Sequence, residues 1–108
     1  MKKKFRVTRN EEFDKLISQK HFVASKPFTV YFNRRQLDHA RIGISVPTRL
    51  GNAVERNQIK RQVRSMLHSF PYYDYPFDCI VIVRAGYLKQ DYGKNKKDLE
   101  KLLKTVKM

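Results

Sequence analysis

The feature that most constrains this chain is a basic segment at its centre, residues 48–64, which reads TRLGNAVERNQIKRQVR. Asn52 stands three residues before Glu55, the spacing of a capping box in which each side chain bonds the other residue's backbone N–H. A helix is therefore expected over about residues 53–69, ending before Pro71. At 100° per residue, one face of this helix is apolar and is predicted to pack on a core: Ile59, Val63, Met66, Leu67 and Phe70.

The same helix carries a row of cations along the edge of its apolar face. Arg56, Lys60 and Arg64 recur at four-residue intervals, and like charges at that spacing are mildly destabilising. The row also lacks the acidic partners that usually support an exposed helix. A solvated basic face with no specific partner is the simplest interpretation, but these two features favour a surface for phosphates. Further toward solvent lie Asn57, Arg61 and His68.

The overall charge also indicates a polyanionic partner. The chain has 24 Lys and Arg against 10 Asp and Glu, a net charge of +14, and such a charge destabilises a compact state by self-repulsion. Nucleic acid, an anionic membrane or an acidic protein would each neutralise it. Hydrophobic residues make up 41% of the 108, which predicts one folded domain over residues 1–108. Residues 1–9 are basic without an acid, and fit a solubilising tail or a phosphate-contacting arm equally well.

Cysteine usage and hydropathy predict a cytoplasmic protein. Cys79 is the only cysteine and lies inside an apolar run, so it is expected to be a buried structural thiol, with no disulfide in the chain. The basic N-terminus is not followed by the apolar stretch of a secretory signal. No apolar run approaches the roughly 18 residues that a membrane span needs.

Hydrophobic periodicity predicts an α+β fold. A short helix is expected to begin at Asn10, with Phe13, Leu16 and Ile17 on one face, and to end near Lys20. Alternating patterns predict strands near residues 22–25, 28–32 and 42–46, with a turn at residues 33–38.

The C-terminal part is predicted to complete the fold with one strand and one helix. The apolar run at residues 78–84 is typical of a strand covered on both faces, and residues 85–94 are expected to be loop. Asn95 is predicted to cap a last helix with an apolar stripe: Leu99, Leu102, Leu103 and Val106. The expected architecture is a two-layer sandwich in the order α-β-β-β-α-β-α.

A catalytic constellation is not evident in the sequence. His21, His39 and His68 are scattered, without paired carboxylates or metal-ligand spacing. Gly51 belongs to a one-glycine turn and not to a phosphate-binding loop. Any nuclease activity would therefore need a catalyst from outside the chain, and no residue set predicts a metal site.

The basic segment resembles the "RNR" signature of the bacterial ribonuclease P protein subunit. The resemblance covers most of the chain, including RIGISV just before the segment, and fades after about residue 85. Thr48 and Arg49 stand where this family usually has a pair of lysines, and Pro47 stands where a small polar residue is common. The matching residues are Gly51, Asn52, Ala53, Val54, Arg56, Asn57, Ile59, Lys60, Arg61 and Arg64.

The resemblance implies a fold and a role for the chain. The family has a ribosomal protein S5 domain 2-like fold, in which the strand–helix–strand crossover is left-handed instead of the usual right-handed form. The implied function is that of a protein cofactor of ribonuclease P. Ribonuclease P is a ribonucleoprotein hydrolase, an endonuclease that matures the 5′ ends of tRNA. Its catalytic groups and its Mg²⁺ belong to the RNA subunit. The implied partners are ribonuclease P RNA and precursor tRNA, with no membrane and no obligate protein partner.

The resemblance also implies two sets of RNA-contacting residues. One set is the signature itself, expected to bind ribonuclease P RNA: Arg49, Asn52, Arg56, Asn57, Lys60, Arg61 and Arg64. The other lines a cleft for the single-stranded 5′ leader of precursor tRNA: Phe13, Ile17, Tyr31, Lys60 and Arg64. Ile17 replaces an aromatic residue that is frequent at its position, so weaker base stacking is expected there.

Other functions fit the same charge less well. A ribosomal protein or general RNA chaperone would bind RNA without a selective effect on precursor tRNA. A DNA reader of the major groove is disfavoured because the basic helix has no preceding helix–turn–helix partner. Attachment to anionic membranes is disfavoured because the apolar face of the helix is needed for the core.

Overall fold

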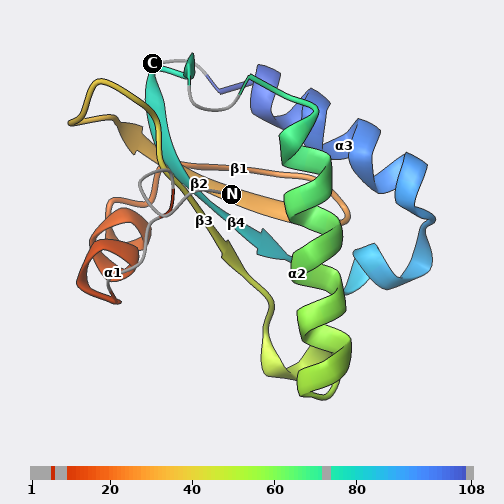
Figure 1. Ribbon diagram of the computed structural model, residues 1–108. Coiled ribbons are helices and arrows are strands. Elements are labelled where there is room, and N and C mark those ends of the chain that lie inside the picture. The colour runs from red at the N-terminus through yellow and green to blue at the C-terminus, as the bar shows by residue number, and fades with distance from the viewer. Residues whose placement is uncertain (1–5, 7–9, 72–73, 107–108) are drawn as a thin grey trace.

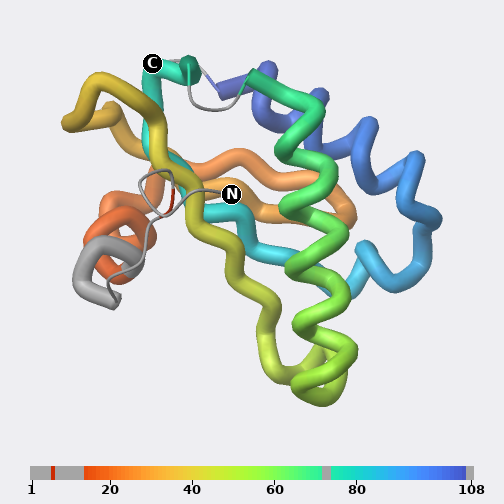
Figure 2. Tube along the Cα trace, in the orientation of Figure 1, coloured from red at the N-terminus to blue at the C-terminus, as the bar shows by residue number. Residues whose placement is uncertain are grey.

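The computed structural model describes residue 6 and residues 10–71 and 74–106, with the backbone alone for residues 10–13 (Figures 1 and 2). Among the described residues, three helices, four strands and the short 3₁₀ turns η2 and η4 follow one another in the predicted α-β-β-β-α-β-α order. They are α1 (Asn10–Ser18), β1 (Phe22–Ala24), β2 (Phe28–Arg34), β3 (Ile42–Ser45), η2 (Thr48–Leu50), α2 (Ala53–His68), β4 (Phe77–Val83), η4 (Ala85–Lys89) and α3 (Tyr92–Lys104).

The four strands form one mixed sheet in the order β1-β2-β4-β3. β2 pairs antiparallel with both β1 and β4, whereas β3 and β4 are parallel and joined through α2. Val81 of β4 pairs with Val30 of β2 on one side and with Ile44 of β3 on the other. This confirms a strand–helix–strand unit around the basic helix, while its left-handed crossover remains what the resemblance implies.

Helices cover both faces of the sheet, as Figure 1 shows: α2 and α3 lie on one face and α1 on the other. The larger core is the predicted sandwich between the sheet and α2 with α3, and includes Phe28, Val63 and Leu99. A smaller cluster forms where Leu16 of α1 packs on Ile80 of β4. β4 is therefore buried from both sides, as its continuous apolar sequence predicted.

The basic helix α2 begins and ends almost where predicted. Asn52 Oδ1 accepts from the backbone N–H of Glu55 at 2.9 Å, and Glu55 Oε1 accepts from the N–H of Asn52 at 2.9 Å. Gly51 precedes this capping box with a φ of +152°, and a Cβ there would lie 2.9 Å from both Cβ and Oε1 of Glu55. The tight turn thus needs glycine. The predicted apolar face is buried: Ile59, Val63, Met66, Leu67 and Phe70.

Several predicted boundaries were wrong, including that of β4, which spans Phe77–Val83 instead of residues 78–84. β2 continues through Asn33 and Arg34, which pair with Asp78 and Phe77, because β4 offers a full-length neighbour that the local sequence does not reveal. The segment predicted as a loop over residues 85–94 contains η4 and the first turn of α3. α1 starts with Asn10 already inside the helix, and it ends at Ser18, slightly before the predicted Lys20.

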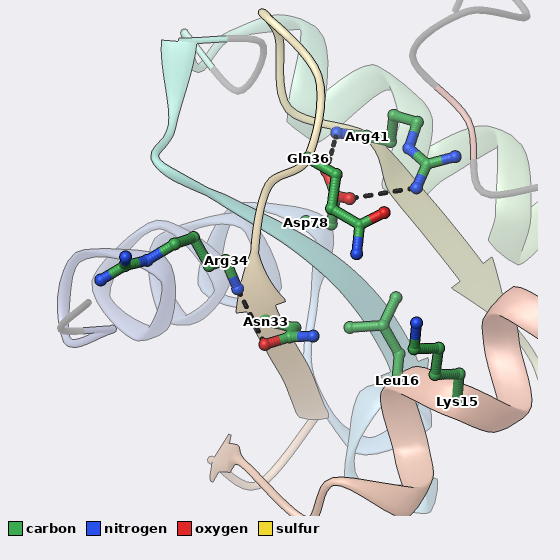
Figure 3. Close-up of a pocket in the computed structure, with 7 residues that line it drawn as sticks. All are labelled: Lys15, Leu16, Asn33, Arg34, Gln36, Arg41 and Asp78. Atoms are coloured by element: carbon green, nitrogen blue, oxygen red, sulfur yellow. Dashed lines mark hydrogen bonds and ion pairs between the residues drawn. The ribbon is translucent and has the colours of Figure 1, made fainter.

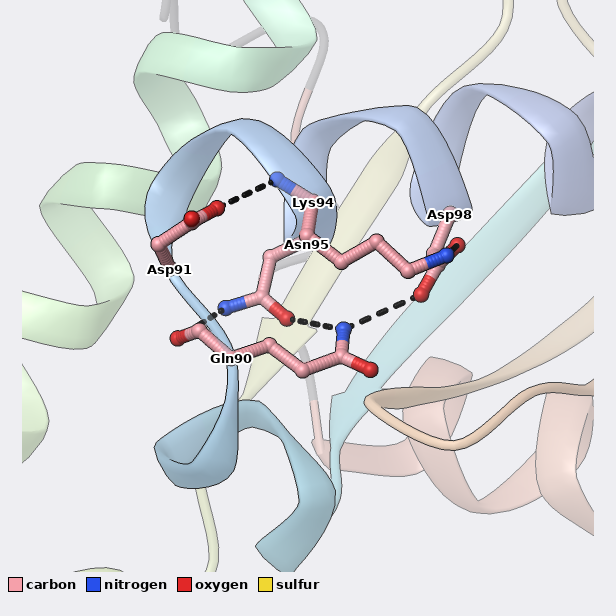
Figure 4. A network of polar contacts seen from close by, with 5 residues as sticks. All are labelled: Gln90, Asp91, Lys94, Asn95 and Asp98. Atoms are coloured by element: carbon pink, nitrogen blue, oxygen red, sulfur yellow. Dashed lines mark hydrogen bonds and ion pairs between the residues drawn. The ribbon is translucent and has the colours of Figure 1, made fainter.

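The predicted cap of the last helix was also wrong. Asp91 caps α3 by accepting from the backbone N–H of Lys94 at 2.8 Å, and Asn95 is buried one turn further on (Figure 4). Asn95 Nδ2 donates to the carbonyl oxygen of Tyr87 at 3.1 Å, and Asn95 Oδ1 accepts from Gln90 Nε2 at 2.9 Å. The asparagine therefore joins η4 to α3 instead of starting the helix.

Candidate nucleic-acid interface

The cation row of α2 lies on the side of the helix that faces away from α3. Tyr87 and Tyr92 donate to Gln62 Oε1 at 2.6 Å and to Ser65 Oγ at 3.0 Å, so these two α2 residues mark the side toward η4 and α3. On a helix of 100° per residue, Arg56, Lys60 and Arg64 fall on the opposite edge of the apolar face. These three side chains are half-buried, while Asn57, Arg61 and His68 are exposed.

The charges of this row are not neutralised within the part of the chain that the structure describes. Asp78, Asp98 and Glu100 form ion pairs with Arg41, Lys94 and Lys104, and no described acid forms an ion pair with Arg56, Lys60 or Arg64. Arg56 also has a buried Nε with no hydrogen-bond partner among the described residues. Since these half-buried cations have no described acidic partner, the row is suited to an external group with acceptor oxygens.

A partly exposed aromatic pair lies on the α1 side of the sheet. Phe22 of β1 and Tyr31 of β2 are directly opposite each other, with ring centroids 5.4 Å apart. Tyr31 is half-buried, whereas 53% of Phe22 is exposed. On the other side, Tyr31 pairs with the fully buried Ile80, so the apolar surface runs from the core out to solvent.

Sequence reasoning missed Phe22 as a candidate site residue. It identified a strand near residues 22–25, but the register that brings Phe22 to Tyr31 depends on the β1–β2 pairing. In the sequence, the available signal was a phenylalanine in a short predicted strand. Its exposure and its place in a three-residue edge strand are known from the structure. Ile17, predicted in the same cleft, is 36% exposed on α1, the helix that covers this face. The side chain of the predicted Phe13 lies outside the described residues.

A small pocket opens beside this face, between α1 and the chain that leads from β2 to β3 (Figure 3). It has a volume of ≈ 170 Å³ and contains cations from three segments together with one acid. The acid, Asp78, is buried and accepts from the backbone N–H of Arg41 at 2.8 Å and from its Nη2 at 3.2 Å. The lining residues are Lys15, Leu16, Asn33, Arg34, Gln36, Arg41 and Asp78.

The remaining predicted site residues are dispersed. Asn52 has its side-chain oxygen engaged in the capping box, and Arg49 is exposed on η2. Lys60 and Arg64 were expected to edge the cleft at Tyr31, but α2 and α1 lie on opposite faces of the sheet (Figure 1). No described contact joins these two cations to the cleft. β3, which is connected to α2 through η2, is one of the two edge strands at which the faces of the sheet meet.

Catalytic groups are not gathered in the described residues. No group of three or more His, Cys, Asp or Glu is placed to hold a metal ion within that part of the chain. Cys79 is buried, and burial raises the pKa of its thiol, which confirms the inert structural role predicted for it. The described helices include none that is both long and apolar enough to span a membrane.

Comparison with known proteins decides the family. The family model described as Ribonuclease P matches residues 1–107. The chain belongs to the ribonuclease P protein family. It is 39% identical over 108 residues to the ribonuclease P protein component of Lactococcus lactis, covering 100% of this chain and 92% of the relative. It is 40% identical to that of Streptococcus mutans, covering 100% and 91% of the two chains.

Solved structures of the family show the same fold. The RNase P protein from Staphylococcus aureus matches with a TM-score of 0.83 and 36% identity, covering 93% of each chain. The RNase P protein from Thermotoga maritima matches with a TM-score of 0.81 and 26% identity, covering 95% of this chain and 98% of the other. The predicted function is thereby confirmed: this is a protein cofactor of ribonuclease P, the ribonucleoprotein endonuclease of tRNA 5′ processing.

Proposed function

We propose that the protein binds ribonuclease P RNA through α2 and the 5′ leader of precursor tRNA through the α1 side of the sheet. The cation row of α2, which pairs with no acid among the described residues, carries the first part of this proposal. Arg56, Lys60 and Arg64 present their charges on a helix that is anchored by its opposite edge and by a complete capping box. Asn57 and Arg61 extend the same surface, and Arg49 and Asn52 precede it.

The aromatic pair supports the second part. Single-stranded RNA is commonly held by bases that stack on aromatic rings while nearby cations contact its phosphates. Phe22 adds a ring to the predicted cleft residues Phe13, Ile17 and Tyr31. A leader that leaves this face across β3 would meet Lys60 and Arg64 on the other side.

The protein contributes charge neutralisation and positioning, and the RNA subunit contributes the chemistry. Each phosphate neutralised by Lys or Arg releases condensed counterions, so the RNA folds and binds Mg²⁺ at a lower Mg²⁺ concentration. Contact with the leader favours precursor over mature tRNA, because the mature product lacks the segment that fills the cleft. We propose the cytoplasm as the location and residues 1–108 as one RNA-binding unit.

Cleavage of precursor tRNA by a bacterial ribonuclease P RNA, with and without the protein at low Mg²⁺, tests this function. We expect strong stimulation, cutting at the mature 5′ end, and no cleavage by the protein alone. Tight, salt-sensitive binding to the RNA without stimulation would instead support a general RNA-binding protein that shares the fold.

A further inference from the structure

A second basic site lies on the η4 side of the α2 start, away from the cation row. Three segments that are distant in sequence converge there: the β1–β2 turn with Lys26, η2 with Arg49, and the chain that leaves β4 with Arg84 and Lys89. In Figure 2 the β1–β2 turn (orange) lies near η4 (light blue), in agreement with the close approach of Gly86 to Lys26. They enclose an open hollow of ≈ 310 Å³, here called the basic hollow, lined by Lys26, Arg49, Arg84, Ala85, Gly86 and Lys89.

The basic hollow differs from the pocket beside α1 and from the groove between β1 and α3 in having no carboxylate in its lining. The pocket beside α1 contains Asp78, which pairs with Arg41. The groove between β1 and α3 contains Asp98, which accepts from Lys94 Nζ at 3.0 Å. In contrast, the four cations of the basic hollow form no ion pair with any described residue, so their mutual repulsion remains uncompensated.

Contacts between the β1–β2 turn and the chain that leaves β4 hold the walls of the basic hollow together. The backbone N–H of Arg84 donates to the carbonyl oxygen of Pro27 at 2.9 Å, and its Nη1 donates to the carbonyl oxygen of Ser25 at 2.9 Å. A Cβ at Gly86 would lie 2.4 Å from the carbonyl oxygen of Lys26, so η4 rests directly on the β1–β2 turn. The guanidinium of Arg84 is therefore oriented before any ligand arrives, with donors left over for phosphate oxygens.

We propose that the basic hollow binds a backbone phosphate of RNA, as a second contact separate from the cation row of α2. This rests on the proposed function, in which RNA already meets the protein at the start of α2. Arg49 connects the two surfaces along the chain, because it lines the hollow and lies on η2, directly before α2. Such a contact fixes the orientation of the RNA without reading its sequence.

Paired charge-neutralising variants test the proposal. Lys26→Gln with Lys89→Gln removes two exposed cations of the basic hollow and leaves the Arg84 anchor in place. Lys97→Gln with Lys101→Gln makes the same change in net charge on the exposed side of α3 and serves as the control. Dissociation constants are measured over a salt series, for isolated ribonuclease P RNA and, separately, for precursor tRNA binding to the assembled holoenzyme.

We expect the hollow variant to lower the slope of log affinity against log salt by about 0.7 to 0.9, which is the contribution of one phosphate contact. A lower slope with isolated ribonuclease P RNA assigns the phosphate to that RNA. A lower slope only for precursor tRNA binding to the holoenzyme assigns the phosphate to the substrate. Lys26→Arg with Lys89→Arg should preserve the slope. Slopes equal to those of the control in both series would overturn the site, whereas failure of cleavage stimulation by the unmodified protein would overturn the proposed function itself.

Discussion

The rings of Phe22 and Tyr31 lie 5.4 Å apart across an antiparallel strand pair, with an interplanar angle of 43°. The flanking pairs are hydrogen-bonded, since Phe32 donates its N–H to the carbonyl oxygen of His21 at 3.0 Å. Phe22 and Tyr31 therefore occupy a non-hydrogen-bonded position, where opposing side chains approach most closely. The pair turns one half-buried tyrosine into a broader aromatic surface.

Removing either ring should weaken leader recognition. We expect Tyr31→Ala and Phe22→Ala each to weaken holoenzyme binding of leader-bearing precursor by about 1–3 kcal/mol, the usual value of a base–aromatic stack. Binding of mature tRNA should change little, and Tyr31→Phe, which keeps the ring, is the matched control. Equal losses for precursor and mature tRNA would show that the pair supports the fold and does not contact the leader.

Neutralising the cation row should flatten the salt dependence of RNA binding. With Arg56, Lys60 and Arg64 all replaced by Ala, we expect the slope of log affinity against log salt to fall by about 2 to 3. Alanine favours helix, so α2 should remain folded, which circular dichroism checks. Lys97→Ala with Lys101→Ala is the control on α3, and an unchanged slope in the triple variant would exclude the row as the RNA contact.

Gly51→Ala should disturb α2 at its first turn. The added Cβ would meet Glu55 at 2.9 Å, on a backbone whose φ of +152° other residues rarely adopt. We expect a loss of about 1–2 kcal/mol in the free energy of unfolding, the range for a lost helix cap, together with weaker RNA binding. Denaturant titration measures the loss, and Gly93→Ala, where a Cβ meets nothing closer than 3.7 Å, is the control.

Asn95→Ala should destabilise the junction between η4 and α3. The substitution removes the donor to the carbonyl oxygen of Tyr87 and the acceptor for Gln90, in a side chain that is 1% exposed. We expect the free energy of unfolding to fall by about 1–3 kcal/mol and the melting temperature to fall by several degrees. Lys97→Ala, on the exposed side of the same helix, should melt like the unmodified protein. A melting temperature unaffected by Asn95→Ala would contradict the structural role of the network.

Tyr87 should make the protein sensitive to alkaline pH. Burial, with a smaller effect of Tyr92, raises the pKa of Tyr87 from 10.0 to about 12 in the folded protein. As pH rises, the unfolded chain loses the Tyr87 proton before the folded protein does. The contribution of Tyr87 to the free energy of unfolding is therefore fully present below pH 10 and decreases as pH rises toward 12, by as much as about 3 kcal/mol. Urea unfolding of the unmodified protein and of Tyr87→Phe at pH 8 to 11 measures this difference. Parallel curves for the two proteins would contradict it.

The spacing of residues along the chain was sufficient to predict those elements that depend on residues close in sequence. The capping box at Asn52 and Glu55 and the apolar face from Ile59 to Phe70 depend on three- and four-residue intervals, and both were predicted correctly. The helix at residues 92–104 shows where such reasoning ends. Asp91 and Asn95 are both acceptable caps by residue type, and only the position of η4 decides that Asn95 is buried.

The basic helix, the order of elements, the charge and the resemblance to the ribonuclease P protein could all be predicted from the sequence, because each depends on residues that are contiguous in the chain. Which distant residues meet became known from the folded structure alone. Strand register brought Phe22 to Tyr31, and the packing of η4 on the β1–β2 turn brought Lys26, Arg49, Arg84 and Lys89 into one hollow. The physical reason is that strand pairing and loop packing act between residues far apart in the chain, where local periodicity carries no information about contact.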